Sequence, residues 1–541
     1  MLNQSQTINN NHNNNFRKSN NLSSVSSKEK PEKFSFEQFL EKVGTQDWYQ
    51  IRSFVCFCIQ WFVIGWFIAS QSFLFQKPQL IEYNVKEKDL CIVLKNNISD
   101  ILKPNQFKSI SMEFSLYCDQ DYLRNIFVFL GPLTAIFSYI IFGYLSDNYG
   151  RKHGLKLAWK IFTFGTIILY LTKVLFLVIS GYIITSFGAY SILIIQLSLI
   201  NEQSTGKVRV LSQVGLNIGF SLGQLIFSFF PFVIEEWRQL VFISAVIPAI
   251  LLNILIEQCK ESPRYYYTKS KIKALRMLNY IASINEKQLL NIDLERSVWS
   301  EEAKYRQFVY QDIFRFQSIR VSLFGGLIIF FCGEMMYKAS EITIHRIDKQ
   351  NIYLQLFYLT LADLIAGIFT LFFINLYKRK IQLQITCILS VLFIITSQIF
   401  SNLYQINIDN DQTFPIIFSM ILIQLSRLFV SYFRNVTFVY FAELFPTVVR
   451  SMTLGMIFSF AQLGLIMIQF MSITQMNDFV LIVPIVFLNI VALFHFQWLP
   501  ETNVENQYIK DEIQEISFGQ DDDFFLEEDD QNIQNKYVKY D

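Results

Sequence analysis

The sequence predicts an all-α membrane protein whose twelve transmembrane helices form two six-helix bundles joined by a cytoplasmic helical linker. Apolar residues make up 52% of the 541 residues and charged residues only 17%, whereas soluble domains carry about 25% charged residues. Twelve apolar segments each have about the 20 residues that a helix needs to span a membrane. A long charged stretch after the sixth segment leaves six predicted spans on either side of it.

The predicted spans fall near 52–75, 123–145, 155–177, 178–201, 211–234, 239–257, 320–340, 352–376, 382–404, 414–441, 452–472 and 478–498. Lys and Arg crowd alternate linkers, such as 151–156 and 378–380, whereas the linkers at 405–413 and 473–477 contain neither. Because basic residues mark cytoplasmic loops, this pattern predicts that both termini face the cytoplasm. An even number of spans agrees with termini on one side.

Composition divides the chain into five predicted parts. These are a cytoplasmic tail and pre-helix over 1–50, a first bundle over 51–257, a linker over 258–319, a second bundle over 320–498, and an acidic cytoplasmic tail over 499–541. The N-terminal tail is rich in Asn and Ser, which predicts disorder.

A polar loop over 76–122 interrupts the first predicted bundle and faces outside. It holds Cys91 and Cys118. We predict that they form a disulfide, because loops exported from the cytoplasm meet an oxidising environment. It also holds the sequon at Asn97, which is usable for glycosylation only if the loop is exported.

Several function classes are disfavoured by the composition. A net charge of +1 argues against a nucleic-acid partner. The seven Cys are too few and too scattered for a zinc site, and the four His form no cluster along the chain. We therefore predict no metal, no cofactor, no catalytic residues and no enzymatic activity.

The string GYLSDNYGRK over 143–152 is a charged turn between two apolar runs. Its glycines allow a tight turn and a close helix approach. Asp147 and Arg151 can hold the two helices together in one state and release them in another. A spacing of seven residues separates Glu202 from Arg209 and again Glu443 from Arg450, six spans later, which indicates an internal duplication.

Further strings narrow the family. They are FLEKVGTQDWYQ (39–50), EWRQL (236–240), CKESPRYYY (259–267), FAELFPTVVR (441–450) and LPET (499–502). With the charged turn, they resemble the organic cation and organic anion transporter family of the major facilitator superfamily over roughly residues 36–505. The resemblance implies a carrier of small organic solutes, with a central cavity that opens alternately to either side. Sugar porters are the second resemblance, although the seventh span lacks their Gln-Gln-Ser-Gly pattern.

The resemblance implies a cytoplasmic charge relay that gates the cavity. Its residues in this chain are Asp147, Arg151, Glu202, Arg209, Glu261, Arg264, Glu443 and Arg450. The alternative is a static structural clamp. The corresponding turn of the second half, NLYKRK over 375–380, lacks both the Gly and the Asp, so we predict an asymmetric gate.

Four ionisable residues lie inside predicted spans, where charges are costly and mark functional sites. Asp363 and Arg427 match an acidic and a basic position of the family and form a predicted intramembrane pair. Glu334 and Arg434 have no counterpart in the family pattern. Arg434 lies nine residues before Glu443, about 13 Å from the cytoplasmic edge and near the membrane midplane. We predict that Glu334 and Arg434 contact the solute or carry a coupling proton; two structural pairs are the alternative.

Two further residues complete the predicted solute site. In the family, the position twelve residues after Arg450 is acidic in cation carriers and basic in anion carriers, but here it is Gln462. Tyr337 can stack on a cationic group or simply fill the bundle. An organic ion or, best, a zwitterion or polar neutral solute is therefore the predicted substrate.

The predicted partners are a small organic solute and the lipid bilayer, with a coupling proton left open. The predicted location is the plasma membrane, with an internal membrane as the alternative. A sugar carrier coupled to protons and a sensor on a carrier fold remain the alternative functions.

Overall fold

Apolar stretches of this length form helices because a helix pairs its own backbone polar groups, which hydrocarbon cannot do. The computed structural model describes residues 36–78, 107–290, 309–347, 352–406, 414–474 and 478–502. Within these ranges, eleven helices are long and apolar enough to cross a membrane, and α21 (Asp478–Trp498) adds a further apolar helix. The predicted all-α fold with twelve spans is confirmed.

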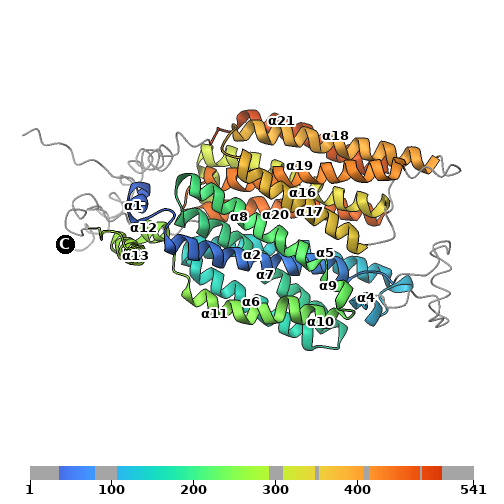
Figure 1. Ribbon diagram of the computed structural model, residues 1–541, viewed down its shortest axis with the longest axis horizontal. Coiled ribbons are helices and arrows are strands. Elements are labelled where there is room, and N and C mark those ends of the chain that lie inside the picture. Colours follow the sequence, from blue (N-terminus) through green and yellow to red (C-terminus); the bar gives the residue numbers. More distant parts are fainter. Residues whose placement is uncertain are drawn as a thin grey trace, which may run out of the picture. The chain divides into compact units, whose positions relative to one another are not determined.

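The long helices lie side by side in Figure 1. In the first half they are α2 (Trp48–Leu74), α5 (Asp121–Tyr149), α6 (Arg151–Leu171), α7 (Leu175–Gln203), α8 (Gly206–Phe227), and a sixth span that joins α10 (Trp237–Val241), the π-helical turn η3 (Phe242–Val246) and α11 (Ile247–Gln258). In the second half they are α16 (Gln317–Ile347), α17 (Ile352–Phe373), α18 (Arg379–Ile406), α19 (Phe414–Leu444), α20 (Arg450–Ile473) and α21.

Shorter helices fill the connections. They are α1 (Phe36–Val43), α4 (Ile110–Glu113), η2 (Cys118–Gln120), α9 (Phe230–Val233), α12 (Pro263–Lys269), α13 (Lys271–Ile284) and α15 (Tyr310–Arg315). The helical linker is thus present where it is described, and α1 packs on α13 through buried apolar side chains. Most of the N-terminal and acidic tails lie outside the described residues.

One predicted boundary is wrong. The sequence places the end of the third span at residue 177, whereas α6 ends at Leu171 and α7 begins at Leu175. Thr172 and Lys173 form the turn between them, because a polar pair at this point ends the apolar run. The fourth span is correspondingly longer than predicted.

The two halves meet along two pairs of helices. The closest packing between them joins α5 to α20 and α8 to α17. A Cβ atom added at Gly143 of α5 would lie 2.6 Å from the carbonyl oxygen of Ser451, and one at Gly455 of α20 would lie 2.5 Å from that of Tyr139. Glycine is therefore required on both sides of the α5–α20 contact, where the backbones approach closely.

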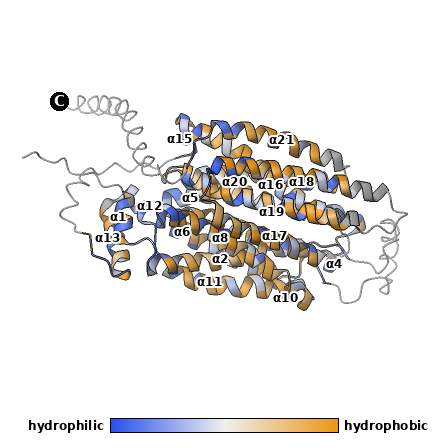
Figure 2. Ribbon diagram, turned by 45° about the horizontal axis from the view of Figure 1, so that its top comes forward, coloured by the Kyte–Doolittle hydropathy of each residue, from blue (hydrophilic) through white to orange (hydrophobic). Residues whose placement is uncertain are grey.

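The outer faces of the long helices carry large apolar side chains. Phe164 is 61% exposed and Ile254 is 65% exposed, and Figure 2 shows that hydrophobic residues dominate the long helices. Such surfaces are stable only against lipid. We call the end of the bundle that holds the turn at 143–152 the charged end, and the other end the opposite end.

Candidate functional site

The charged turn joins α5 to α6 at the charged end. Gly150 has a φ of 113°, a backbone conformation that other residues avoid, so the chain can turn there within one residue. The guanidinium of Arg151 lies 2.8 Å from the carboxylate of Asp147, and both side chains are buried. The predicted Asp147–Arg151 pair is therefore present.

Arg151 also connects the first half to the second. Its Nε and Nη2 donate to Glu202 Oε1 of α7, at 3.1 and 2.9 Å. Its Nη2 also donates to the carbonyl oxygen of Thr447, at 2.8 Å, beside the start of α20. One buried cation thus ties α6, α7 and the second half together.

Asp147 forms a second connection between the halves. Its carboxylate accepts hydrogen bonds from the backbone N–H groups of Met452, at 2.8 Å, and Ser451, at 3.4 Å. These groups belong to the first turn of α20, where the helix dipole favours a negative charge. Separating α5 from α20 would therefore leave both the carboxylate and the helix end without these partners.

Glu261 stabilises the same turn from the linker. Its carboxylate accepts from the backbone N–H groups of Arg151, at 3.0 Å, and Lys152, at 3.1 Å, which begin α6. Burial raises the pKa of this carboxyl above its usual range. Arg264 places its guanidinium over the ring of Phe36 in α1, so it links the relay to the N-terminal helix.

In the second half, the relay uses residues that the sequence reading missed. Glu443 forms a buried ion pair with Arg379, the first residue of α18. Glu501 accepts from the backbone N–H groups of Arg379, at 3.0 Å, and Lys380, at 3.3 Å. Arg379 and Glu501 thus repeat the roles of Arg151 and Glu261.

A sequence signal for this repeat exists in the paired strings GRK and KRK. The turn before α18 nevertheless differs from the first turn. Asn375 stands four residues before Arg379, as Asp147 stands four residues before Arg151, and its side-chain oxygen has no hydrogen-bond partner. The two halves of the chain are therefore unequal at this position, as the predicted asymmetry of the gate requires.

The ion pairs that the structure shows for Glu202 and Glu443 do not join them to the arginines seven residues later in the sequence. Glu202 contacts Arg151, and Arg450 of the second half lies 3.7 Å from it. Arg209 donates to the carbonyl oxygen of Ser204, at 3.1 Å. The relay residues therefore gather at one end, but Glu202 pairs across elements and across the halves.

Asp363 of α17 and Arg427 of α19 form a bidentate ion pair within the membrane-spanning region. Both N···O distances are 2.8 Å. Tyr337 donates its hydroxyl to the same carboxylate at 2.9 Å, and Ser431 donates to it as well. The backbone oxygen of Tyr337 and the hydroxyl of Ser340 accept from Arg427. Every charge of this pair is thus satisfied within the second half.

Glu334 of α16 and Arg434 of α19 form a second, looser pair. Their closest N···O distance is 3.0 Å, and Arg434 retains 22% of its side-chain exposure, against 4% for Arg427. The Nε–H group of Arg434 is not aligned with the Glu334 carboxylate as a hydrogen bond requires. The guanidinium carbons of Arg427 and Arg434 lie 3.3 and 3.9 Å from the centre of the Tyr337 ring.

A small cavity of about 30 Å³ lies beside these pairs, between α8 of the first half and α16, α17 and α19 of the second. Its lining comprises Asn217, Phe220, Ser221, Tyr337, Asp363, Ser431, Arg434, Asn435 and Phe438. Of the four predicted solute-contacting residues, it includes Tyr337 and Arg434. Glu334 reaches it through its pair with Arg434, and Gln462 is buried elsewhere on α20.

The polar face of α8 is a part of the site that the sequence reading missed. Gln213, Asn217, Ser221 and Gln224 recur at helical spacing and are buried. Asn217 lines the cavity, and its side-chain N–H₂ has no hydrogen-bond partner. The spacing of these four polar residues in the sequence is the signal that could have predicted this face.

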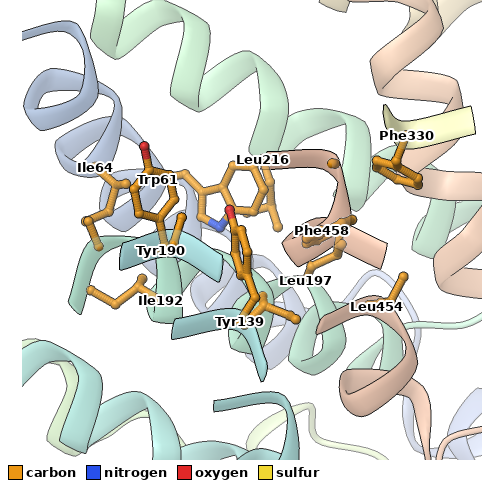
Figure 3. Close-up of a cluster of buried hydrophobic side chains, with 14 of the residues drawn as sticks. Trp61, Ile64, Tyr139, Tyr190, Ile192, Leu197, Leu216, Phe330, Leu454 and Phe458 are labelled. Carbon is orange, nitrogen blue, oxygen red and sulfur yellow. The ribbon is translucent and has the colours of Figure 1, made fainter. Parts of the chain in front are cut away.

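Aromatic rings pack at the junction of the halves. The ring of Tyr139 in α5 lies 5.7 Å from that of Tyr190 in α7 and 5.5 Å from that of Phe458 in α20, an arrangement visible in Figure 3. Glu334 interacts electrostatically with both tyrosines. Tyr190 therefore supplies an aromatic ring on α7 within electrostatic reach of Glu334.

The opposite end is closed by aromatic rather than ionic contacts. Phe73 of α2 stacks on Tyr353 of α17 with ring centres 5.5 Å apart. Phe232 of α9 lies 4.8 Å from the same ring, and Phe229 lies 5.3 Å from Phe357. Both ends of the junction between the halves are thus occupied by side chains.

The remaining predictions concern the loop over 76–122. Cys118 is disulfide-bonded, whereas Cys91 and Asn97 lie outside the described residues, so the Cys91–Cys118 pairing and the glycosylation site stay predictions. Among the described residues, no group of three His, Cys, Asp or Glu side chains is arranged to hold a metal ion.

Comparisons with known proteins identify the architecture. The chain matches the family model described as "Sugar (and other) transporter" over residues 49–506. It is 24% identical over 464 residues to organic cation/carnitine transporter 4 of Arabidopsis thaliana, covering 82% of this chain and 84% of that protein. It is 23% identical over 421 residues to solute carrier family 22 member 13 of Homo sapiens, covering 77% and 73% respectively.

A solved structure shares the fold. The proton:xylose symporter XylE of the major facilitator superfamily, bound to 6-bromo-6-deoxy-D-glucose, superposes with a TM-score of 0.61 at 15% identity. The match covers 85% of this chain and 98% of that chain. Together with the spans and the junction between two helical halves, these matches show that the chain belongs to the Sugar (and other) transporter family and is an integral membrane transporter of the major facilitator fold.

Proposed function

We propose that the chain carries a small zwitterionic organic solute across the plasma membrane by alternating access. The charged end and both termini face the cytoplasm in this proposal. The observation that carries it is the loose Glu334–Arg434 pair beside the cavity. The carboxylate of the solute replaces Glu334 at Arg434, and its cationic group replaces Arg434 at Glu334.

The contrast between the two intramembrane pairs supports this assignment. The Asp363–Arg427 pair has a bidentate geometry and several hydrogen bonds, so opening it would expose two buried charges at a cost of several kcal/mol. In the Glu334–Arg434 pair the closest N···O contact, 3.0 Å at Arg434 Nε, is not aligned as a hydrogen bond, and Arg434 is partly exposed. A zwitterion can exchange with this pair without leaving either charge unpaired.

Aromatic and polar side chains around the pair suit the same solute. Tyr139 and Tyr190 lie within electrostatic reach of Glu334, and aromatic faces attract cations. Asn217 offers unpaired N–H groups to an anionic or carbonyl oxygen. Carnitine, which appears in the name of the Arabidopsis relative, carries a quaternary ammonium and a carboxylate and is a solute of this class.

The dimensions of the cavity support alternating access. A volume of about 30 Å³ is far below the roughly 300–1,000 Å³ of pockets that bind small organic molecules. The contacts of Asp147 and Arg151 close one end of the junction, and aromatic contacts close the other. Binding and release therefore require the halves to separate at one end at a time.

The distribution of charge supports the orientation. Lys152 and Lys156 of α6 and Lys380 of α18 lie at the charged end, and basic residues near the ends of spans favour the cytoplasmic side. The plasma membrane is the location that follows from the resemblance to organic-ion carriers.

Uptake into proteoliposomes tests the proposal. Labelled carnitine, tetraethylammonium, p-aminohippurate and xylose are compared at two external pH values. We expect carnitine to enter and uptake to fall in Arg434→Gln and Glu334→Gln. The matched control is Glu257→Gln, which removes an exposed ion pair with Lys156 at the charged end and leaves uptake unchanged.

The panel also separates the alternatives. If xylose alone is taken up, and only with an acidic outside solution, the proposed zwitterionic substrate would be wrong and the chain would be a sugar carrier coupled to protons. Uptake of tetraethylammonium or p-aminohippurate that is insensitive to both variants would remove the Glu334–Arg434 pair from the site.

A further inference from the structure

Two thiols from distant parts of the chain meet near the charged end. Cys56 lies in the third turn of α2, and Cys259 follows the last residue of α11. Their Sγ atoms are 3.7 Å apart and share a hydrogen bond. Cys56 is half-buried and Cys259 is 9% exposed. At this distance the two sulfurs are in direct contact.

The surroundings of this thiol pair are polar and positively charged. Gln60 donates its side-chain N–H to Cys56 Sγ at 3.3 Å. Arg52, one turn before Cys56, interacts electrostatically with both sulfurs, and Lys152 interacts with Cys259. Reactive cysteines occur in such electropositive, partly exposed surroundings, whereas structural cysteines lie in apolar ones.

The other described free thiols lack this arrangement. Cys58, two residues along α2, points to the carbonyl oxygen of Gly215 in α8 at 3.7 Å. Cys332 bonds to the carbonyl oxygen of Leu488, and Cys387 bonds to Asn489. These three sulfurs therefore serve as internal references for reactivity.

We propose that Cys56 and Cys259 form a reversible disulfide when the membrane or the cell interior is exposed to peroxide. The Cys56 thiolate attacks one oxygen of hydrogen peroxide and forms a sulfenic acid, releasing water once a proton is taken up. The Cys259 sulfur then displaces the second water as the S–S bond forms. Two thiols and one peroxide thus give one disulfide and two waters.

The bond would act on the charge relay. A disulfide needs an S–S distance of about 2.05 Å, so the two sulfurs must approach by more than an ångström from 3.7 Å. Cys259 lies two residues before Glu261, whose carboxylate holds the first backbone N–H groups of α6. Oxidation therefore displaces the segment that stabilises the charged turn.

The inference is tested first by chemistry, without any transported solute. The purified full-length chain is treated with hydrogen peroxide, free thiols are blocked, and cross-linked peptides are mapped by mass spectrometry. We expect a Cys56–Cys259 linkage that dithiothreitol reverses, that is lost in both Cys56→Ser and Cys259→Ser, and that persists in the control Cys58→Ser.

Three results would overturn the inference. They are the absence of any linkage, a linkage of Cys56 to Cys58, and oxidation of Cys332 or Cys387 at the same peroxide concentration. A poorly folded Cys56→Ser protein would not obscure the outcome, because Cys259→Ser removes the linkage independently.

Transport gives a second readout, which depends on the proposed function. We expect peroxide to slow uptake by the parent chain and by Cys58→Ser, with recovery on reduction, and to leave Cys56→Ser unaffected. If the disulfide is mapped but uptake does not change, the reactive thiol pair is supported and its proposed effect on the charge relay is contradicted. Failure of all uptake, with the disulfide present, would instead contradict the proposed substrate.

Discussion

Single side chains of similar chemistry have opposite roles in this transporter because their surroundings differ. Arg427 and Arg434 lie two turns apart on α19, and both guanidiniums contact the Tyr337 ring. Arg427 is fully engaged by Asp363, Tyr337 and Ser340. Arg434 has one loose partner and borders the cavity. Burial and the number of partners therefore separate a structural cation from a candidate binding cation.

This contrast predicts different outcomes for two alanine variants. Arg427→Ala leaves the Asp363 carboxylate buried without its partner, which costs about 3–5 kcal/mol and lowers the melting temperature and the yield. Arg434→Ala lowers the melting temperature less and chiefly reduces carnitine uptake. Thermal unfolding in detergent and uptake measure the two effects. Equal losses of stability would contradict the distinction.

Glu261 gives the relay a pH dependence whose sign can be derived. Its pKa is raised in the folded protein, so folding binds protons at this group. The contribution of Glu261 to folding stability is fully present below the ordinary glutamate pKa of about 4.3. That contribution is lost as the pH rises through the raised pKa of the folded state.

We therefore expect the contribution of Glu261 to the free energy of unfolding to fall from about pH 4.3 upwards, with a flatter pH profile in Glu261→Gln. Thermal unfolding of both proteins across this range provides the measurement. The same slope in both proteins would assign the pH dependence to another group.

Sequence reasoning located these residues better than it paired them. Asp363, Arg427, Glu334 and Arg434 were identifiable because charges inside apolar spans are rare. The repeated spacing of Glu202 and Arg209 does not reveal the ion-pair partners, since the contacts shown for Glu202 come from helices distant in the chain. Arg379 and Glu501 were not assigned to the relay, although they lie in the strings NLYKRK and LPET that the sequence analysis quotes.

At the scale of helices, α5 and α20 come into backbone contact at the junction of the two halves. Gly143 and Gly455 allow the two helices to approach until main-chain atoms touch. Asp147 then reaches the first turn of α20. The spans themselves were predictable from hydropathy, but this contact was not, because glycine spacing does not reveal which helix lies opposite.

A methyl group at this contact should open the charged end. A Cβ at residue 143 would lie 2.6 Å from backbone oxygen, which cannot move aside, so Gly143→Ala forces α5 away from α20. The control is Gly154→Ala, whose Cβ would make ordinary contacts with Ile195 at 3.4 Å and with Ser146 at 3.8 Å.

Spin labels at Tyr149 and Tyr377, both exposed at the charged end, report the change as a distance. We expect the distance to increase in Gly143→Ala and to stay the same in Gly154→Ala. An unchanged distance in Gly143→Ala would show that the α5–α20 contact does not control closure.

For the whole molecule, the two ends of the junction close by different chemistry. Buried ion pairs and helix-end contacts close the charged end, and contacts between aromatic rings close the opposite end. Separating a buried ion pair leaves uncompensated charges, whereas separating aromatic rings exposes no charge. The twelve spans and two halves followed from the sequence, but this difference between the ends needed the three-dimensional contacts.

The most direct test of alternating access breaks each closure separately and measures both ends. Label pairs are placed at Tyr149 and Tyr377 for the charged end and at Phe176 and Ile417 for the opposite end, all of which are exposed. Asp147→Asn weakens the first closure, and Tyr353→Ala weakens the second. We predict that each variant widens only its own end and that neither lets solute leak through the membrane. Widening of both ends in one variant, with passive leakage of solute, would contradict the account.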